Sequence, residues 1–240
     1  MILARLSRAV REQNWFAVAL EFVIVIAGVV IGFQVTAWNE VRADRIAEQR
    51  YVERLYEDVL TSIADQANTG DAADAQFQTA RRMAVIAGRG DLGDINEADF
   101  KADLSGLAGW RAVAVTNATL EEMFATGHIG LIQSDEIRSV LTEYRTQYQN
   151  AVIANGNVGD LILSHWTLVQ NNLEFEWRDD ERVIVTPVDE ILSNGAIANH
   201  LDQLAGLYLQ IARIQMRVSE DTNSLRNILL EAYDGIGNAQ

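Results

Sequence analysis

One uninterrupted apolar run near the N-terminus constrains this chain more than any other feature. Between Trp15 and Trp38 the sequence contains a single ionisable residue, Glu21. At about 1.5 Å per residue, a helix over this run is long enough to span the roughly 30 Å hydrocarbon core of a bilayer. Trp15 and Trp38 stand at its two ends, where amphipathic rings favour the headgroup region. The run therefore predicts a transmembrane helix over residues 15–38, with the lipid bilayer around it.

A cleaved signal peptide is the main alternative to a retained anchor. Val35, Thr36 and Ala37 form an acceptable small-residue cleavage site, and basic residues precede the apolar run. However, the run exceeds the usual length of about 7 to 15 residues, contains Glu21, and passes into a helix-forming sequence without a breaker. We therefore favour an uncleaved anchor that follows a basic N-terminal tail, residues 1–14.

The orientation of the anchor depends on the basic residues at its two sides. Arg5, Arg8 and Arg11 make the N-terminal side cationic, but arginines also follow the span, where they alternate with acidic residues. The positive-inside rule counts basic residues and nearly ties here. A short basic N-terminus usually stays inside, and long domains translocate regardless of charge. We expect a bacterial inner-membrane protein with a cytoplasmic N-terminus and a periplasmic domain; the alternative is a cytoplasmic domain on an anchor of opposite orientation.

The apolar run carries one small and polar stripe. At 100° per residue, four residues fall within about 20° of one line, namely Glu21, Gly28, Gly32 and Asn39. A G-x-x-x-G spacing lets helix backbones approach closely, and a carboxyl group that faces lipid is costly. The stripe predicts a helix–helix interface, either in a homo-oligomer or with another membrane protein. The alternatives are a chance spacing of glycines and a Glu21 side chain that reaches the nearby membrane interface.

Beyond residue 38 the sequence favours an all-α fold. Pro187 is the only proline among 240 residues, against a usual frequency of about 5%. Residues 39–67 contain no glycine or proline, and their apolar residues recur at spacings of three and four. This pattern predicts a helical stalk that continues the anchor. Residues 39–240 are expected to form one helical-bundle domain.

Glycines and capping residues predict where helices in this domain begin and end. Gly70 is a candidate interruption of the first helix, and three glycines at residues 88–93 are expected to end it. Asn96 is expected to cap a helix that ends near residue 109. The only plausible strands are residues 174–177 and 182–186, which predict a small exposed β-hairpin near 174–186.

Two further helices are predicted in the middle of the chain. Thr119 and Glu122 have the spacing of a capping box, and Gly127 suits the residue after the last turn, so residues 119–126 read as a short helix. Ser134 is expected to cap a longer helix, which Gly156 and Gly159 would punctuate.

The last helix has a coiled-coil-like seam. Two heptad series run along it, Leu204, Ile211, Val218 and Leu225 in one and Tyr208, Gln215, Thr222 and Leu229 in the other. Gln215 and Thr222 put a polar step into this seam. A polar step can specify register, but we favour the interpretation that it is the solvated edge of an ordinary bundle helix.

No pattern of residues indicates catalysis, a cofactor or a metal. The three histidines (His128, His165 and His200) are far apart and lack ligand spacing, so core or surface histidines are favoured over a metal site. Phosphate-binding loops, dinucleotide fingerprints and nucleophile elbows are also missing from the sequence. We expect a protein that is not an enzyme and binds no cofactor.

The charge of the chain argues against nucleic acid as a partner. The net charge is −15, and residues 40–240 hold all but three of the 19 basic and all but two of the 34 acidic side chains. Phosphate backbones would be repelled by such a domain. Most of the charge is explained by solubility alone.

Two parts of the sequence resemble a known family. The first is the anchor, with Glu21, Gly28, Gly32 and Gln34 before Trp38-Asn39-Glu40; the second is Thr119-Leu-Glu-Glu-Met-Phe-Ala-Thr-Gly127, followed by Leu131-Ile-Gln-Ser-Asp-Glu-Ile-Arg138. Together they resemble an uncharacterised family of bacterial single-span membrane proteins that carries a domain-of-unknown-function label. Leu120 and Met123 depart conservatively from its more usual aromatic and leucine. The resemblance covers the last hundred residues poorly, and it implies a fold and membrane placement but no activity.

Two classes of function fit these features. The first is a non-enzymatic oligomeric scaffold or sensor-like protein that acts through protein–protein contacts. The second is an accessory subunit of an ion- or proton-linked membrane complex, in which Glu21 takes up and releases a proton.

Overall fold

The computed structural model describes residues 15–233, with the backbone alone for residues 15–18. The chain divides into two compact units, Met1–Arg50 and Tyr51–Gln240, and each is described by itself. The described elements are helices apart from one two-stranded sheet, which confirms the all-α fold class. The basic tail with Arg5, Arg8 and Arg11 lies outside the described residues.

Helix α2 (Trp15–Arg89) supplies the first unit. Its side chains from Ala19 to Ile46 are all exposed. This stretch includes a segment long and apolar enough to cross a membrane, and none of that segment is buried within the protein. The helix begins at Trp15 and passes through Trp38 without a break, as the sequence predicted for the anchor and stalk.

The expected interruption at Gly70 is wrong, because α2 continues through it to Arg89. A Cβ atom at Gly70 would meet nothing within 4 Å, so the glycine neither breaks the helix nor serves a close approach. One glycine costs a helix only about 1 kcal/mol. Burial of Ala73, Ala80 and Met83 in the following turns outweighs that cost. The glycines at residues 88–93 do end the helix, with Gly90 at φ +74°.

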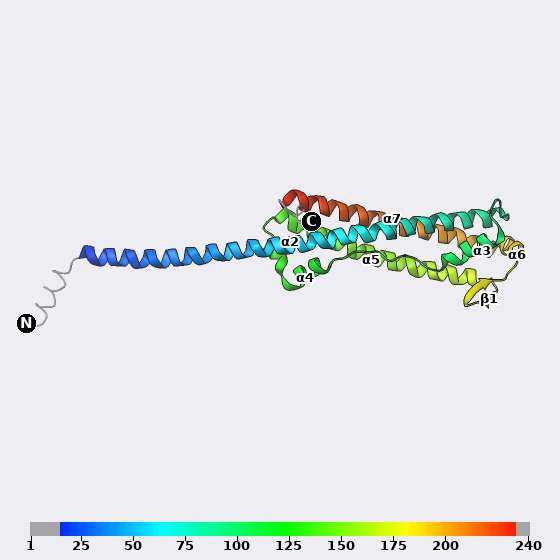
Figure 1. Cartoon of the computed structure of the whole chain (residues 1–240), viewed down its shortest axis with the longest axis horizontal. Helices are drawn as coiled ribbons and strands as arrows, with labels where there is room; N and C mark the ends of the chain where they lie inside the picture. Colours follow the sequence, from blue (N-terminus) through cyan, green and yellow to red (C-terminus); the bar gives the residue numbers. More distant parts are fainter. Residues whose placement is uncertain (1–14, 234–240) are drawn as a thin grey trace, which may run out of the picture. The chain divides into compact units, whose positions relative to one another are not determined.

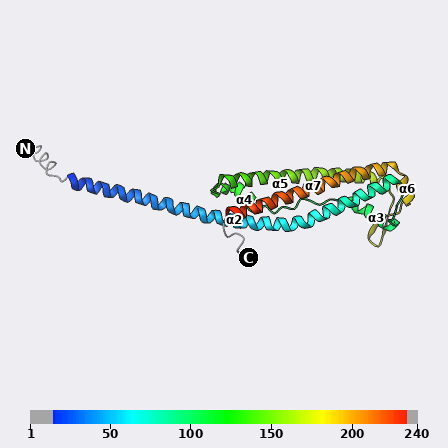
Figure 2. The ribbon, with the colours of Figure 1, turned by 90° about the horizontal axis from the view of Figure 1, so that it is seen from above.

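The second unit is built on three long helices. From Tyr51 onward, α2 lies alongside α5 (Asp135–Gln170) and α7 (Gly195–Ala232), as both views in Figures 1 and 2 show. Shorter helices connect them: α3 (Glu97–Ser105), η1 (Gly106–Ala108), α4 (Ala118–Thr126), η2 (His128–Leu131) and α6 (Val188–Ser193). As predicted, Asn96 caps α3 and Ser134 caps α5, with side-chain oxygens that accept from Asp99 N and Ile137 N.

The predicted hairpin is confirmed between α5 and α6. Strands β1 (Phe175–Arg178) and β2 (Glu181–Ile184) pair antiparallel, with Phe175 opposite Ile184. The two-residue loop consists of Asp179 and Asp180, with φ values of 48° and 67°. Positive φ at both loop positions matches the right-handed twist of the paired strands.

The predicted interruption of α5 at Gly156 and Gly159 is wrong, since the helix continues through both glycines. Gly159 is buried, and an added Cβ would overlap the indole ring of Trp110. The glycine therefore serves packing: it lets the Trp110 ring lie directly on the backbone of α5. Gly156 has open space where its Cβ would be and has no such role.

Two apolar clusters form the core of the second unit. One joins α2, α4, α5 and α7 and contains Val52, Leu120, Leu141 and Leu225. The other gathers residues toward the opposite ends of these long helices, together with α3 and α6, and is centred on Met83, Phe100, Ile162 and Leu204. On each long helix the two clusters are separated by buried polar residues, which are Ser62 and Gln66 on α2, Asn155 on α5, and Gln215 and Thr222 on α7.

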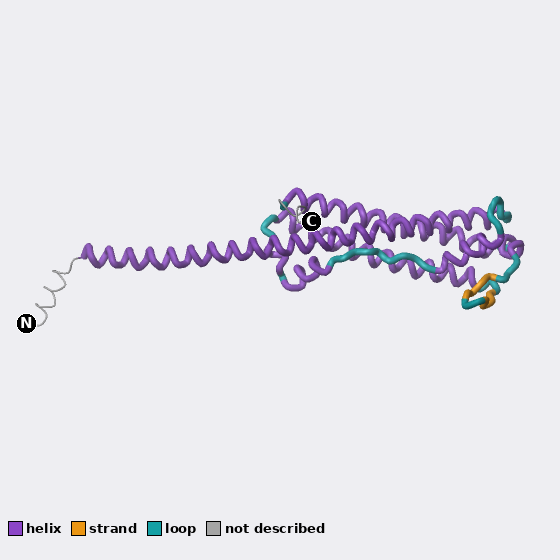
Figure 3. The backbone as a smooth tube through the Cα atoms, viewed as in Figure 1, coloured by secondary structure: helices purple, strands orange, loops and turns teal. Residues whose placement is uncertain are grey.

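An extended segment, residues 109–117, runs along the three long helices from η1 to α4. In Figure 3 it is the loop that follows the bundle between these two short helices. Because it belongs to no helix or sheet, its backbone groups need side-chain partners if they are to be buried at low cost.

Candidate functional site

The predicted interface stripe lies on one uninterrupted helix. Glu21, Gly28, Gly32 and Asn39 are all exposed, and an added Cβ at either glycine would meet nothing within 4 Å. The helical geometry keeps the four residues on one face, as their spacing predicted. No other part of the described chain covers this face, so it is free to pack against another helix.

Of the two predicted membrane-interface anchors, only Trp38 has a described side chain. The side chain of Trp15 lies outside the described residues, whereas Trp38 is 63% exposed. The Arg42 guanidinium lies over the Trp38 ring, 5.9 Å from its centroid. Trp38, Val41, Arg42 and Arg45 line a shallow hollow of about 270 Å³. An aromatic ring beside two arginines suits the headgroup region of a bilayer.

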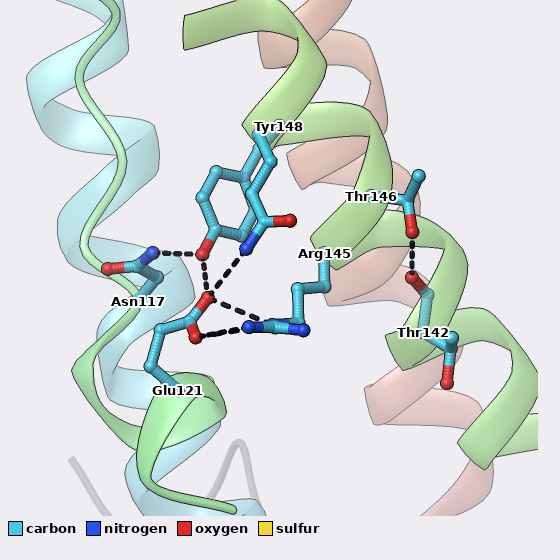
Figure 4. A network of polar contacts seen from close by, with 7 residues as sticks. Asn117, Glu121, Thr142, Arg145, Thr146 and Tyr148 are labelled. Atoms are coloured by element: carbon cyan, nitrogen blue, oxygen red, sulfur yellow. Dashed lines mark hydrogen bonds and ion pairs between the residues drawn. The ribbon is translucent and has the colours of Figure 1, made fainter. Parts of the chain in front are cut away.

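The second unit has a cluster of charged contacts around α4, the helix of the T-L-E-E sequence. The Glu121 carboxylate accepts from Arg145 at both oxygens, at 3.0 Å from Nε and 2.8 Å from Nη2. The Tyr148 hydroxyl also donates to Glu121, and Asn117 donates to that hydroxyl (Figure 4). Burial, and then the nearby carboxylate, raises the pKa of Tyr148 to about 12, which keeps it protonated as a donor. The arginine holds the pKa of Glu121 below its usual value.

The neighbouring carboxylate holds α4 against α2. Glu122 accepts from Arg54 at 2.5 Å and from the Tyr51 hydroxyl at 3.0 Å. His128 Nδ1 lies 2.6 Å from the same hydroxyl. Because that hydroxyl gives its one proton to Glu122, the histidine is the donor in this contact. The two glutamates thus hold α4 against two helices. Glu121 binds Arg145 of α5, and Glu122 binds Arg54 of α2.

The predicted capping box at Thr119 and Glu122 is wrong. The helix begins one residue earlier, at Ala118, and Glu122 is occupied by Arg54 instead of bonding back to the start of α4. The backbone N–H of Thr119 donates to Asp58 Oδ2 at 2.8 Å. A carboxylate of α2 therefore caps α4 from another part of the chain, which also complements the helix dipole. The predicted αL residue Gly127 is confirmed, at φ +77°.

The buried polar residues hold the extended segment by side-chain hydrogen bonds. The Tyr208 hydroxyl lies 2.9 Å from the Gly109 carbonyl oxygen, and Gln76 donates to the same oxygen at 2.6 Å. Gln215 donates to Ala112 O at 3.1 Å, and Gln66 donates to Ala114 O at 3.0 Å. At the far end, Ser62 accepts from Thr116 N at 2.8 Å.

The prediction that Gln215 and Thr222 form a solvated edge is therefore wrong. Gln215 is 3% exposed and Thr222 is fully buried. Three successive residues of one heptad series face the interior: Tyr208 and Gln215 bind the extended segment, and Thr222 accepts from Gln66. The sequence showed their spacing, but their partners lie about 100 residues or more away and include main-chain carbonyls, which no side-chain pattern reveals.

Two of the histidines that are far apart in sequence meet in the structure. His165 of α5 and His200 of α7 are half-buried, and their Nδ1 atoms lie 3.2 Å apart. Burial, and then the neighbouring imidazole, lowers the pKa of His165. Across residues 15–233, groups of three or more histidines, aspartates or glutamates with metal-site geometry do not occur.

Comparisons with known proteins add no further identification. No protein-family model, curated protein or solved structure matches this chain. The resemblance in the anchor and in the T-L-E-E segment thus stays a prediction from the residues themselves.

Proposed function

We propose that this protein is a membrane-anchored oligomeric scaffold or sensor-like component that acts through protein–protein contacts and performs no catalysis of its own. The observation that carries the proposal is the exposed stripe of Glu21, Gly28, Gly32 and Asn39 on the apolar part of α2. A carboxyl group inside hydrocarbon needs a hydrogen-bonding partner, and the glycines allow a second helix to come close enough to supply one.

Self-association is tested by substitution on and off the stripe. Gly28→Leu or Gly32→Leu should weaken association, because a large side chain keeps the backbones apart. Val29→Leu is the matched control, since Val29 is exposed on the same turn but faces elsewhere. Glu21→Ala should weaken association by about 1 to 2 kcal/mol. Crosslinking and mass photometry in mild detergent measure this. A wild type that is monomeric at every concentration, with glycine variants identical to it, would refute self-association through the stripe.

The proposed location is the bacterial inner membrane, with a cytoplasmic N-terminus and the helical domain in the periplasm. Its support is the length of the apolar run and the three N-terminal arginines, Arg5, Arg8 and Arg11. The protein should resist carbonate extraction, and protease added to spheroplasts should digest the domain. Digestion only after lysis would support the opposite orientation, and a mature N-terminus near Trp38 would show that the segment is a cleaved signal.

The second candidate is an accessory subunit of an ion- or proton-linked membrane complex. It is favoured by one observation, an ionisable Glu21 on an otherwise apolar stretch of helix. Glu21→Gln separates the two functions, because a glutamine keeps the hydrogen bond but cannot carry a proton. A scaffold should keep its association and its partners with this change, whereas a proton-linked subunit should lose its activity with assembly intact.

A further inference from the structure

The contact between His165 and His200 suggests a site that the rest of the molecule does not explain. The two imidazoles come from α5 and α7, and their ring centroids lie 5.4 Å apart. Each presents its Nδ1 to the other, at 3.2 Å. A neutral pair can make only one hydrogen bond here, with one ring as donor and the other as acceptor.

We propose that His165 and His200 together bind one transition-metal ion of the Zn²⁺, Co²⁺ or Ni²⁺ class between α5 and α7. Bonds of about 2.0 to 2.1 Å from one ion to two imidazole nitrogens at a near-tetrahedral angle place those nitrogens roughly 3.3 Å apart. The observed separation of 3.2 Å already meets this requirement. An ion bound to both Nδ1 atoms would therefore replace the hydrogen bond between the rings with little change in the distance between the two nitrogens.

The surroundings of the pair suit an ion that arrives from solution. Both histidines are half-buried, so the pair lies at the border between the core and the solvent. Only the neutral imidazole binds a metal. In the described part of the chain no carboxylate or third histidine completes the set, so water fills the remaining positions. This is an open site rather than a closed four-ligand structural one.

The composition of the chain makes the site easy to isolate. Cysteine is absent, and His128 is the only other histidine. Its Nδ1 forms a hydrogen bond with the Tyr51 hydroxyl, next to α4. His128→Ala is therefore a matched control, which removes one imidazole without touching the pair.

The test is a titration of the full chain in mild detergent with Zn²⁺ by calorimetry, and with Co²⁺ by visible absorption. Wild type and His128→Ala should each bind one ion per chain, saturating below about 1 mM. His165→Ala and His200→Ala should each weaken binding at least about tenfold, which corresponds to loss of one ligand bond. Circular dichroism shows whether each variant keeps its helices. Because protons compete for both rings, binding should also weaken on going from pH 7.5 to pH 5.5.

Stability gives a second readout that does not depend on the heat of binding. An ion that binds only the folded chain raises Tm, by about 3 to 6 °C for each tenfold increase in free metal above the dissociation constant. This increase should disappear in both pair variants and persist in His128→Ala. Any of three results would overturn the proposal: no saturable binding by wild type, equal binding by the pair variants and wild type, or one ion for every two chains.

Discussion

At the scale of single residues, the structure shows why some glycines and charges stand where they do. Gly156 and Gly159 lie three positions apart in α5, yet only the second has a neighbour that fills the place of a Cβ atom. Likewise Glu121 and Glu122 are adjacent in sequence, yet their partners come from different helices, Arg145 of α5 and Arg54 of α2. Neighbouring residues of the same type therefore have different structural roles, and substitutions at the two glycines can be compared directly.

The two glycines predict opposite effects on stability. Gly159→Ala places a methyl group against the Trp110 ring and should destabilise the fold by about 1 to 3 kcal/mol. Gly156→Ala meets open space and removes backbone freedom from the unfolded chain, so it should stabilise by about 0.5 to 1 kcal/mol. Urea denaturation of both variants measures the difference. Equal shifts in the same direction would contradict the close packing of Trp110 on α5.

The carboxylate of Glu121 predicts a dependence on pH. Glu121→Gln removes the charge paired with Arg145 and should cost about 1 kcal/mol at pH 7, a modest value because the side chain is 36% exposed. Arginine lowers the folded pKa of Glu121, so its contribution is complete above the unfolded pKa of about 4.3 and is lost as pH falls through the folded pKa.

Denaturation at pH 7 and near pH 3 checks this expectation. The gap between wild type and Glu121→Gln should be present at the higher pH and should narrow at the lower. Glu57→Gln, an exposed carboxylate on α2, is the control and should change little at either pH. A constant gap would show that the variant acts through packing instead of charge.

At the scale of elements, the extended segment depends on side chains of the long helices. Gln66 donates to Ala114 O and to the Thr222 hydroxyl, so it joins α2, the segment and α7 at one point. The residues that bind the segment lie in the interval between the two apolar clusters or at its borders. A polar layer in the core thus replaces the backbone pairing that a strand would find in a sheet.

Gln66→Leu tests this dependence. The substitution keeps the size of the side chain but leaves the Ala114 carbonyl without its Gln66 donor, which should cost about 1 to 3 kcal/mol. The Thr222 hydroxyl loses Gln66 but keeps its contact with the Tyr144 hydroxyl. The unpaired Gln66 Oε1 disappears at the same time, which offsets part of the loss. Gln78→Leu, on an exposed face of α2, should change the free energy of unfolding by less than about 0.5 kcal/mol. Urea midpoints that shift equally for both would argue against the polar layer.

The elements that the sequence predicted well are those governed by local chemistry. Asn96, Ser134 and Gly127 act on backbone groups within three or four residues of themselves, so their roles could be read directly. Several of the wrong predictions concern residues whose partners are distant in the sequence. Thr119 has the spacing of a cap but is capped by Asp58, and Gly159 reads as a breaker until Trp110 is placed on it. The contact between His165 and His200, which the sequence analysis did not predict, depends on how two separate helices pack.

At the scale of the whole molecule, the second unit contains its own interior. Both apolar clusters and the residues that hold the extended segment lie between residues 51 and 233. The segment with membrane-crossing character lies in the first unit and buries none of its apolar surface within the protein. Solubility and folding of the second unit are therefore expected to be independent of the first.

A chain that begins at Arg45 tests this independence. It should remain in aqueous solution without detergent and should show a strongly helical circular-dichroism spectrum, because its two apolar clusters are buried within it. The full chain should require detergent under the same conditions. Aggregation of the shortened chain in water, or a spectrum dominated by strand, would contradict the division.

The packing of α2, the first long helix to be synthesised, depends on α7, the last one. The contact between Gln66 and Thr222 joins positions 156 residues apart, and α7 is the last of the three long helices to be made. At about 5 to 20 residues per second, the apolar face of α2 waits roughly 8 to 30 seconds on the ribosome for the helix that covers it. A nascent chain that stops before residue 195 lacks the α7 residues of both apolar clusters and is therefore expected to expose apolar surface that the complete fold buries.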